Sequence, residues 1–180
     1  MVAHQEEIQQ AITDALATMP HDTVIIVATD TEKQIIDETL TTHPLPYDIH
    51  IIQTGAGISN TLDTLLPLNL DSPIFNFGYV GSNQIKKFSI LTVNEVRHYH
   101  PSVSFDRPEP KLLLKTIPGL VPATCYTCQD FVHDTTIKEP AIFDMELAII
   151  ARLYQHQPVF SLKIVSDNMD LDEYNQTISA

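Results

Sequence analysis

The stretch "VIIVAT" at residues 24–29 is a short run of β-branched and apolar residues, and the polar segment "DTEK" follows it directly. Such a run predicts a strand that is buried on both faces of a sheet. Further strands are predicted at "IHIIQT" (49–54), "PIFNFGYVG" (73–81), "KFSILTVNEV" (87–96) and "VFSLKIV" (159–165). Because helix-compatible segments alternate with these runs, we expect a single α/β domain with a central mixed, largely parallel sheet flanked by helices.

Outside these strands the predicted elements are less regular. Apolar residues recur at helical spacing over residues 2–19 until Pro20, so we assign 1–22 to an N-terminal helical extension and 23–180 to the α/β domain. Residues 97–118 are rich in proline and polar groups and predict a long loop. A strand is possible at 121–132, and a helix is predicted from the "AIFDM" segment to about Tyr154.

Composition and charge limit the classes of function. The chain has 180 residues, of which 43% are hydrophobic and 18% charged, and its net charge is −13. A phosphate backbone or an anionic membrane surface would be repelled by such a chain, whereas a small neutral or cationic ligand remains possible. No apolar run approaches the roughly 20 residues of a membrane span, and the N-terminus is polar and acidic. We therefore expect a cytoplasmic protein.

Polar residues and glycines follow several of the predicted strands. Open α/β sheets bind ligands at the carboxyl ends of their strands, so these segments are the first candidates for a site. They are Asp30 to Glu32, "TGAGISN" (54–60), "FGYVGS" (77–82) and "SDNMD" (166–170). Asp167 comes directly off an apolar strand. Glu32, taken alone, is explained as an exposed acid in the first turn of a helix, where the helix dipole favours it.

Glu146 is an acid in an otherwise apolar segment, "IFDMELAIIA" (142–151). If the whole segment were helical, its neighbours three and four positions away would be Ile142, Phe143, Ile149 and Ile150. The segment is therefore either a core helix that carries an acid at some cost in stability, or a helix that delivers an acid to a site.

Four other motifs are weak. "GAG" (55–57) lacks the third glycine of a dinucleotide fingerprint. Cys125 and Cys128 lack two further zinc ligands and are interpreted as core cysteines, and His98 and His100 have no evident companion ligands. The acidic segment 167–175 lacks the glycine and the terminal glutamate of a calcium-binding hand loop, and predicts a solvated loop. We therefore expect no metal and no organic cofactor.

Several of these stretches, taken in order, resemble the nucleoside phosphorylase and nucleosidase superfamily. They are "VIIVATDTE", "TGAGISN", "FNFGYVGS", "QDFV", "FDMELAIIA" and "LKIVSDNMD". The resemblance is greatest to the methylthioadenosine/S-adenosylhomocysteine nucleosidases and extends from about residue 24 to 170. The Met-Glu and Ser-Asp elements are its most specific parts.

The resemblance implies a role for each candidate residue. Glu146 would hold the ribose hydroxyls, Asp167 would serve the purine N7, and Glu32 would activate the attacking water. The implied substrate-binding residues are Gly55, Gly57, Gly78, Phe131, Val132, Met145, Glu146 and Ser166. The chemistry suits these residue types, because breaking an N-glycosidic bond requires an acid for the leaving base and a base for the water.

Three functions remain open at this stage. An N-ribosyl hydrolase acting on an adenine-type nucleoside is favoured, because an acid at Glu32 suits water as the nucleophile. A phosphorylase would need cations for phosphate, and only Lys33, Arg97 and Lys163 are plausible. A noncatalytic nucleoside-binding domain is the third alternative. The family commonly forms dimers, so a homodimer is also expected.

Overall fold

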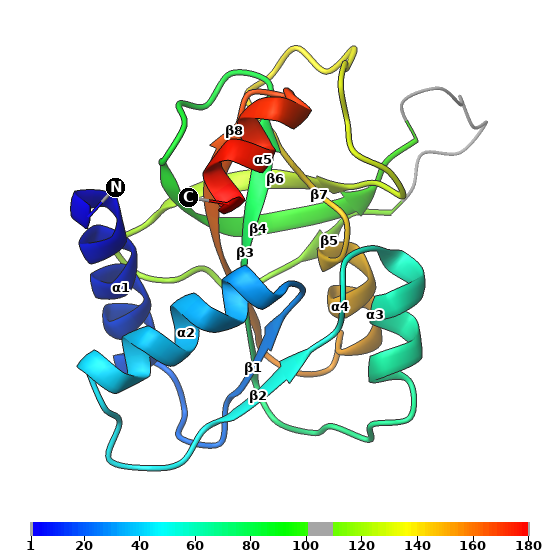
Figure 1. Ribbon diagram of the computed structural model, residues 1–180. Helices are drawn as coiled ribbons and strands as arrows, with labels where there is room; N and C mark the ends of the chain where they lie inside the picture. The colour runs from blue at the N-terminus through cyan, green and yellow to red at the C-terminus, as the bar shows by residue number, and fades with distance from the viewer. Residues whose placement is uncertain (1, 101–109, 180) are drawn as a thin grey trace.

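The strand predicted at residues 24–29 is present as β1 (Val24–Val27), and all four of its residues are buried. The fold is that of a computed structural model, which describes residues 2–100 and 110–179 (Figure 1). β1 lies between β2 (His50–Gln53) and β3 (Ile74–Ser82) and is parallel to both. Burial on both faces explains the unbroken apolar sequence of this strand.

The remaining strands close part of the sheet into a barrel. β3 pairs in parallel with β8 (Val159–Asp167) and antiparallel with β7 (Ile142–Asp144). β6 (Val121–Thr127) is parallel to both β7 and β4 (Ile90–His98). β4 returns antiparallel to β8 and also holds the short β5 (Leu112–Leu113) antiparallel at its edge. The sheet is therefore mixed, and a largely parallel sheet describes only part of it.

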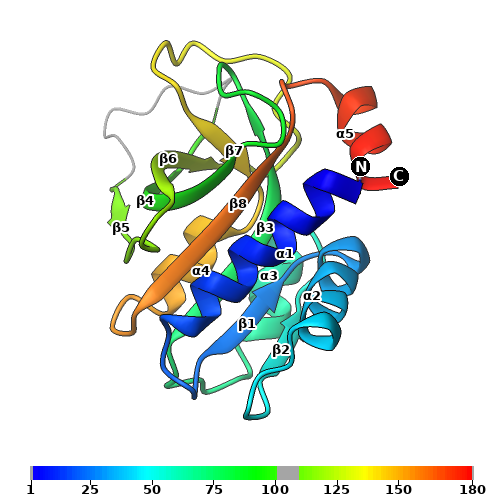
Figure 2. The ribbon, with the colours of Figure 1, turned by 90° about the vertical axis from the view of Figure 1, so that its left-hand side faces the viewer.

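Helices flank the sheet. α1 (Val2–Ala17) packs beside α2 (Asp30–Thr42), and Figure 2 shows α1 running alongside β8. α3 (Ile58–Leu65) and α4 (Leu147–Leu153) contact each other, and Figure 1 shows them on the side of the domain away from α1. Ile12 and Leu16 of α1 belong to the same core cluster as Phe75 and Ile164 of the sheet. The N-terminal helix is thus part of the main core.

The prediction for residues 142–151 is wrong at its start. Residues 142–144 are extended in β7, Glu146 is the N-cap of α4, and the helix begins only at Leu147. The Asp144 carboxylate accepts a hydrogen bond from the Leu147 backbone N–H at 2.8 Å, which satisfies one of the free amides of the first turn. Glu146 therefore does not lie within a helix between Ile142 and Ile150.

Other boundaries also differ from the prediction. Residues 171–179 form the helix α5 (Leu171–Ser179) in place of a solvated loop, with the Asp170 side chain accepting from the Glu173 amide at 3.0 Å. The predicted strand over 121–132 ends at Thr127, and the loop predicted over 97–118 contains the end of β4 and all of β5. Residues 101–109 of that loop lie outside the described residues.

Cys125 and Cys128 are free and buried, as expected for core cysteines. Within the described ranges, every helix is too short or too polar to cross a membrane.

Candidate active site

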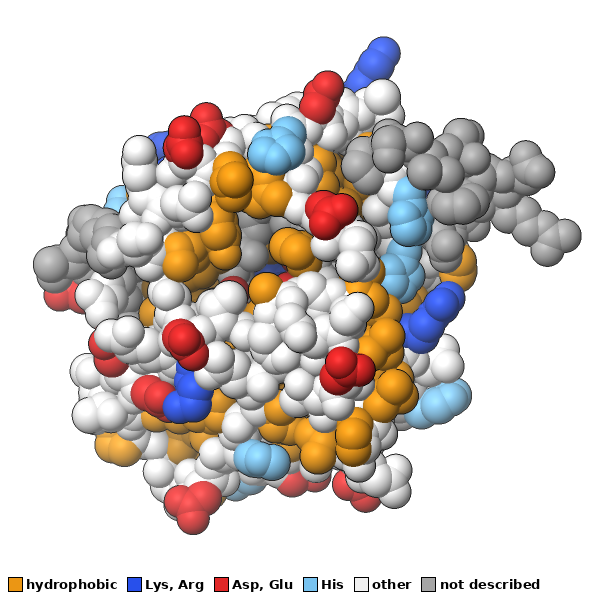
Figure 3. All heavy atoms as spheres, turned by 45° about the vertical axis from the view of Figure 1, so that its right-hand side comes forward, with side chains coloured by type: hydrophobic (Ala, Val, Ile, Leu, Met, Phe, Trp, Pro, Cys, Tyr) orange, Lys and Arg blue, Asp and Glu red, His pale blue; other side chains and the backbone are white. Residues whose placement is uncertain are grey.

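A cavity of about 250 Å³ opens near the carboxyl ends of β1, β3 and β8. This is the edge of the sheet at which the strand-end rule places a ligand. Figure 3 shows a hollow in this face of the molecule, with hydrophobic side chains around it. Six of the residues implicated by sequence line the cavity: Glu32, Phe131, Val132, Met145, Glu146 and Asp167.

The other four predicted residues lie behind this lining. The Gly57 N–H donates to Glu146 Oε1 at 2.9 Å, and the Ser166 hydroxyl donates to Asp167 Oδ1 at 2.7 Å. Gly78 lies against Glu32, because a Cβ added to it would be 3.1 Å from Glu32 Oε1. Gly55 is farther from the cavity, where its positive φ of 81° shapes the turn after β2.

Glu32 is held by three backbone amides. Its Oε2 accepts from Ala28 N at 2.8 Å and Thr29 N at 3.1 Å, and its Oε1 accepts from Tyr79 N at 3.1 Å. Thr29 and Glu32 form a capping box at the start of α2. The carboxylate is only 5% exposed, so the interpretation of Glu32 as an exposed helix acid is wrong. Burial raises the pKa of Glu32, although Lys163 and the amides oppose the shift.

Glu146 reaches the cavity because it lies, with Met145, between the end of β7 and the start of α4. Burial, together with the nearby Asp144 carboxylate, raises the pKa of Glu146 to about 7. Gly57 belongs to the turn after β2, so the hydrogen bond from its amide connects two segments that are 89 residues apart. The second oxygen, Oε2, has no hydrogen bond within the described residues and is available to a ligand hydroxyl.

Asp167 ends β8 and is fully buried. Its Oδ2 accepts from the Met169 amide at 2.9 Å, and Gly81 leaves room for it, because a Cβ there would lie 3.0 Å from Oδ2. Burial raises the pKa of Asp167, while the hydrogen bonds from Ser166 and Met169 oppose the shift. A carboxyl group in this environment is suited to holding a proton and giving it to a ligand atom.

Beneath the cavity lies a polar cluster that the sequence reasoning did not assign to the site. Lys163 of β8 is 1% exposed, and its Nζ is 3.3 Å from Asp144 Oδ2. The Thr127 hydroxyl donates to Asp144 Oδ1 at 2.5 Å and accepts from Ala148 N at 2.9 Å. The signal is present in the sequence, because Lys163 interrupts the apolar strand predicted at 159–165 and Asp144 interrupts the apolar segment 142–151.

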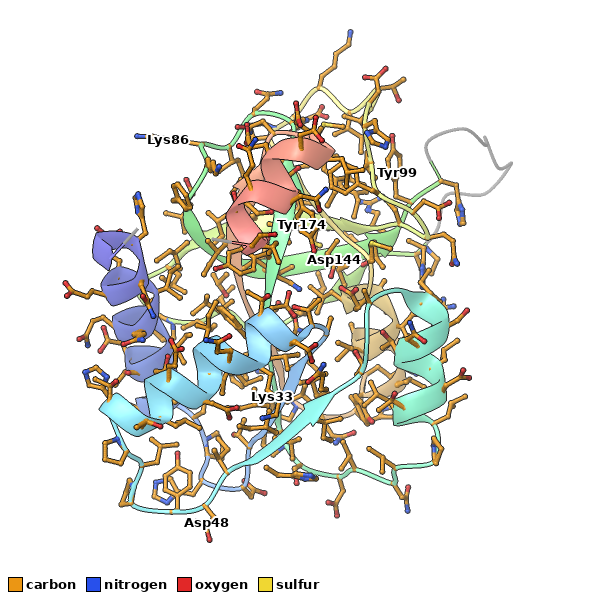
Figure 4. All side chains as sticks on the ribbon, viewed as in Figure 1. Lys33, Asp48, Lys86, Tyr99, Asp144 and Tyr174 are labelled. Atoms are coloured by element: carbon orange, nitrogen blue, oxygen red, sulfur yellow. The ribbon has the colours of Figure 1, made fainter. Side chains whose placement is uncertain are left out.

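Aromatic side chains form another part of the wall. The ring of Phe131 lies 5.8 Å from that of Tyr174, centroid to centroid. Figure 4 labels Tyr174 on α5 and Asp144 at the end of β7, and both residues line the cavity. Burial, reinforced by Glu32, raises the pKa of Tyr174 to about 12 and likewise that of Tyr79, so both remain neutral phenols. A flat heterocycle can pack on such a surface.

The charges of the lining are of one sign. Five carboxylates line the cavity, from Glu32, Asp130, Asp144, Glu146 and Asp167, and no lysine or arginine among the described residues does so. Of the three cations considered from sequence, Lys33 pairs with Asp37 on an exposed part of α2, and Arg97 lies 3.9 Å from Glu95 on β4. The cavity therefore favours a neutral or cationic ligand.

Comparisons with known proteins give a result at the level of structure. No family model matches the sequence, and no curated protein sequence matches it significantly. A variant of the MTAN of Chlamydia trachomatis bound to MTA is similar with a TM-score of 0.70 and 16% identity, over 88% of this chain and 87% of that chain. Futalosine hydrolase of Helicobacter pylori has a TM-score of 0.67 and 16% identity, over 88% of this chain and 89% of that chain.

A third similar structure is the 5′-methylthioadenosine/S-adenosyl homocysteine nucleosidase (MTAN) of Helicobacter pylori. Its TM-score is 0.65 at 15% identity, over 87% of this chain and 90% of that chain. The chain therefore has the same fold as these two nucleosidases and the futalosine hydrolase.

Proposed function

We propose that this protein is an N-ribosyl hydrolase that cleaves the glycosidic bond of a purine nucleoside, with methylthioadenosine or S-adenosylhomocysteine as the favoured substrates. The observation that carries the proposal is the cavity itself, in which Glu32, Glu146 and Asp167 converge within about 250 Å³. The similar structures include a complex with MTA, which supports a nucleoside ligand in this fold.

Each carboxylate has a chemical task in this reaction. Glu32 takes a proton from a water molecule that attacks C1′ of the ribose. Asp167 gives a proton to N7 of the purine, so that the C1′–N9 bond breaks and the base leaves as a neutral molecule. Glu146 accepts hydrogen bonds from the ribose hydroxyls, and its negative charge stabilises the cationic sugar of the transition state.

The remaining predicted residues support these three. Phe131 and Val132 would contact the base, Met145 would pack on the sugar, and Ser166 would orient Asp167. Gly57 donates to Glu146 and so fixes the carboxylate that faces the ribose. Gly78 leaves room for Glu32, and Gly55 shapes the turn that carries Gly57.

Water is favoured over phosphate as the nucleophile. A phosphate dianion would have to enter a cavity lined by five carboxylates, and Lys163 lies behind the wall and is already paired with Asp144. Enzymes that bind phosphate generally surround it with arginine, lysine or backbone amides. At this site the amides of Ala28, Thr29 and Tyr79 already donate to Glu32, and that of Gly57 donates to Glu146.

We also propose that the protein is a cytoplasmic homodimer. The resemblance to a family that commonly dimerises supports this, and so do the exposed Leu66 and Leu68 that follow α3 and Leu171 at the cavity. Light scattering during size-exclusion chromatography measures the mass directly. A monomer of 20.2 kDa at micromolar concentration would contradict the proposal.

The direct test of the activity is release of free base from methylthioadenosine, S-adenosylhomocysteine, adenosine, inosine and futalosine, each with and without phosphate. We expect release without phosphate, fastest with an adenine nucleoside. Release that requires phosphate would make the protein a phosphorylase. Release only from futalosine would indicate a futalosine hydrolase, like the similar enzyme of Helicobacter pylori. A nucleoside that raises the melting temperature without being cleaved would identify a binding domain.

A further inference from the structure

Lys163 carries a positive charge at a buried position behind the lining of the cavity. Its side chain is 2% exposed, and its partner Asp144 is 1% exposed. A fully buried lysine is rare unless it is paired, because removing an ammonium group from water is costly. The pair with Asp144, at 3.3 Å, explains how the charge is tolerated, but it does not explain why a lysine is present in the strand.

The geometry around Gly78 connects this lysine to Glu32. A Cβ added to Gly78 would lie 3.1 Å from Lys163 Nζ and 3.1 Å from Glu32 Oε1, so the ammonium and the carboxylate face the same small space above β3. The two charged groups are therefore within about 6 Å of one another, a distance at which opposite charges interact strongly in a buried site.

The other charged and titratable groups that face Lys163 come from three further elements. Asp144 belongs to β7, Glu146 to the start of α4 and Cys125 to β6. Burial alone would lower the pKa of Lys163, but these groups and Glu32 outweigh it and raise the pKa. Glu146 in turn is affected by Asp144, Lys163 and Glu32, and Tyr174 faces both Glu32 and Glu146. One ammonium group therefore interacts electrostatically with three carboxylates, those of Asp144, Glu146 and Glu32.

We propose that Lys163 is a positioning residue for the reaction: its buried ammonium favours the ionised forms of Glu32 and Glu146, and Asp144 holds that ammonium beneath the cavity. The inference rests on the proposed function in the roles that it gives to Glu32 and Glu146. Lys163 itself contacts neither substrate nor water in this scheme. Asp144 pairs with the ammonium at 3.3 Å, and without the lysine its charge would only repel these carboxylates.

Two roles for the Lys163–Asp144 pair can be distinguished by the direction in which each substitution shifts the pH dependence of kcat/KM. If the pair only holds β7 against β8, then removing either partner weakens the fold and lowers kcat/KM by a similar factor at every pH. If the pair sets the ionisation of the site, the two removals act in opposite directions. Lys163→Met takes away the charge that favours the carboxylates, whereas Asp144→Asn takes away one that opposes them.

The experiment is the pH dependence of kcat/KM for base release in wild type, Lys163→Met, Lys163→Arg and Asp144→Asn. We expect the acidic limb to move up by about one to two pH units in Lys163→Met, which is roughly a tenfold to hundredfold loss below the limb. It should move down in Asp144→Asn and stay near the wild-type position in Lys163→Arg. Lys33→Met, which removes an exposed lysine paired with Asp37, is the matched control and should leave the profile unchanged.

A second measurement needs no turnover and separates failure of this inference from failure of the proposed function. In the folded protein, carboxylates that hold protons to higher pH make stability fall more steeply as pH rises. The melting temperature of Lys163→Met should therefore decline more between pH 6 and 8 than that of wild type, and that of Asp144→Asn should decline less. If Lys163→Met does not fold, Asp144→Asn and the double variant Lys163→Met/Asp144→Asn still test the sign. Parallel shifts, or losses uniform in pH, would overturn the inference.

Discussion

Replacing Glu146 by glutamine should make the protein more stable and less active at the same time. An unfolded glutamate has a pKa of 4.5, whereas burial and Asp144 raise that of Glu146 to about 7 in the folded protein. The folded state therefore holds this proton over a pH range in which the unfolded chain releases it. The contribution of Glu146 to stability is therefore greatest below the unfolded pKa of 4.5. It declines as pH rises through the folded pKa of about 7 and stays reduced above it.

The magnitude follows from the size of the shift. A displacement of about 2.5 pH units corresponds to about 3.4 kcal/mol at 1.36 kcal/mol per unit. Because the Glu146 carboxylate faces a cavity that is open to water, solvent screens part of this, and about 2 kcal/mol is the more realistic gain for Glu146→Gln. The glutamine oxygen can still accept the hydrogen bond from Gly57. In a domain of 180 residues such a gain raises the melting temperature by about 4–8 °C.

The assay is thermal denaturation at pH 5 and pH 8, with base release measured on the same samples. We expect the melting temperature of Glu146→Gln to exceed that of wild type at pH 8. At pH 5 the difference should be small, because wild-type Glu146 is already protonated there. The loss of kcat/KM should be on the order of 100-fold to 1000-fold, because a charge that stabilises the transition state is missing. Glu6→Gln, at an exposed position of α1, is the control. A variant that melts no higher than wild type at pH 8 would refute the electrostatic argument, and one with full turnover would refute the ribose role.

Three further variants test the other parts of the site. Glu32→Gln should lower the rate of hydrolysis by about 10²–10⁴-fold, because the general base is lost. It should also lower the melting temperature, because a glutamine side chain cannot accept hydrogen bonds from all three amides. Phosphate-dependent cleavage that survives in this variant would point to a phosphorylase. Gly78→Ala places a methyl group 3.1 Å from both Glu32 Oε1 and Lys163 Nζ, so we expect at least about a tenfold loss of kcat/KM, with far-ultraviolet circular dichroism unchanged. Asp167→Asn should abolish cleavage of adenine nucleosides and spare p-nitrophenyl riboside, whose leaving group needs no proton; equal losses on both substrates would argue against proton donation.

The longer apolar strands were predictable because their physical cause is local, whereas β5 and β7 lie in segments that predict a loop and a helix. "VIIVAT" can only be buried on both faces, and its position between β2 and β3 meets that need. The antiparallel pairings of β7 with β3 and of β4 with β8 were not predictable, because the side-chain pattern of a short strand does not depend on the direction of its partner strand. Closure into a barrel depends on these pairings.

The site was predictable where a residue stands at a strand end and not where its partners come from distant segments. Asp167 follows a clear strand, and the sheet rule assigns it to the ligand edge. The unmatched charge of Glu146 leaves two interpretations open, and the family resemblance assigns it to the ribose whether or not residues 142–146 are helical. The sequence around Glu32 predicts an exposed acid in the first turn of a helix. Its hydrogen bond from the Tyr79 amide of β3 joins residues 47 positions apart, and this contact is not visible in the local sequence.

The buried lysine shows why a polar residue inside an apolar strand should be given functional weight. Replacing a buried ion pair by apolar residues of similar volume is often neutral or stabilising, so Lys163 and Asp144 are not explained by stability. Glu146, whose ionisation costs about 2 kcal/mol by the argument above, is not explained by stability either. Both costs occur at the same cavity, and Lys163 reduces the cost of ionising Glu146 and Glu32. The arrangement is consistent with a site that must keep two carboxylates charged beside a cationic transition state, and a fold retained only for its stability would have no such requirement.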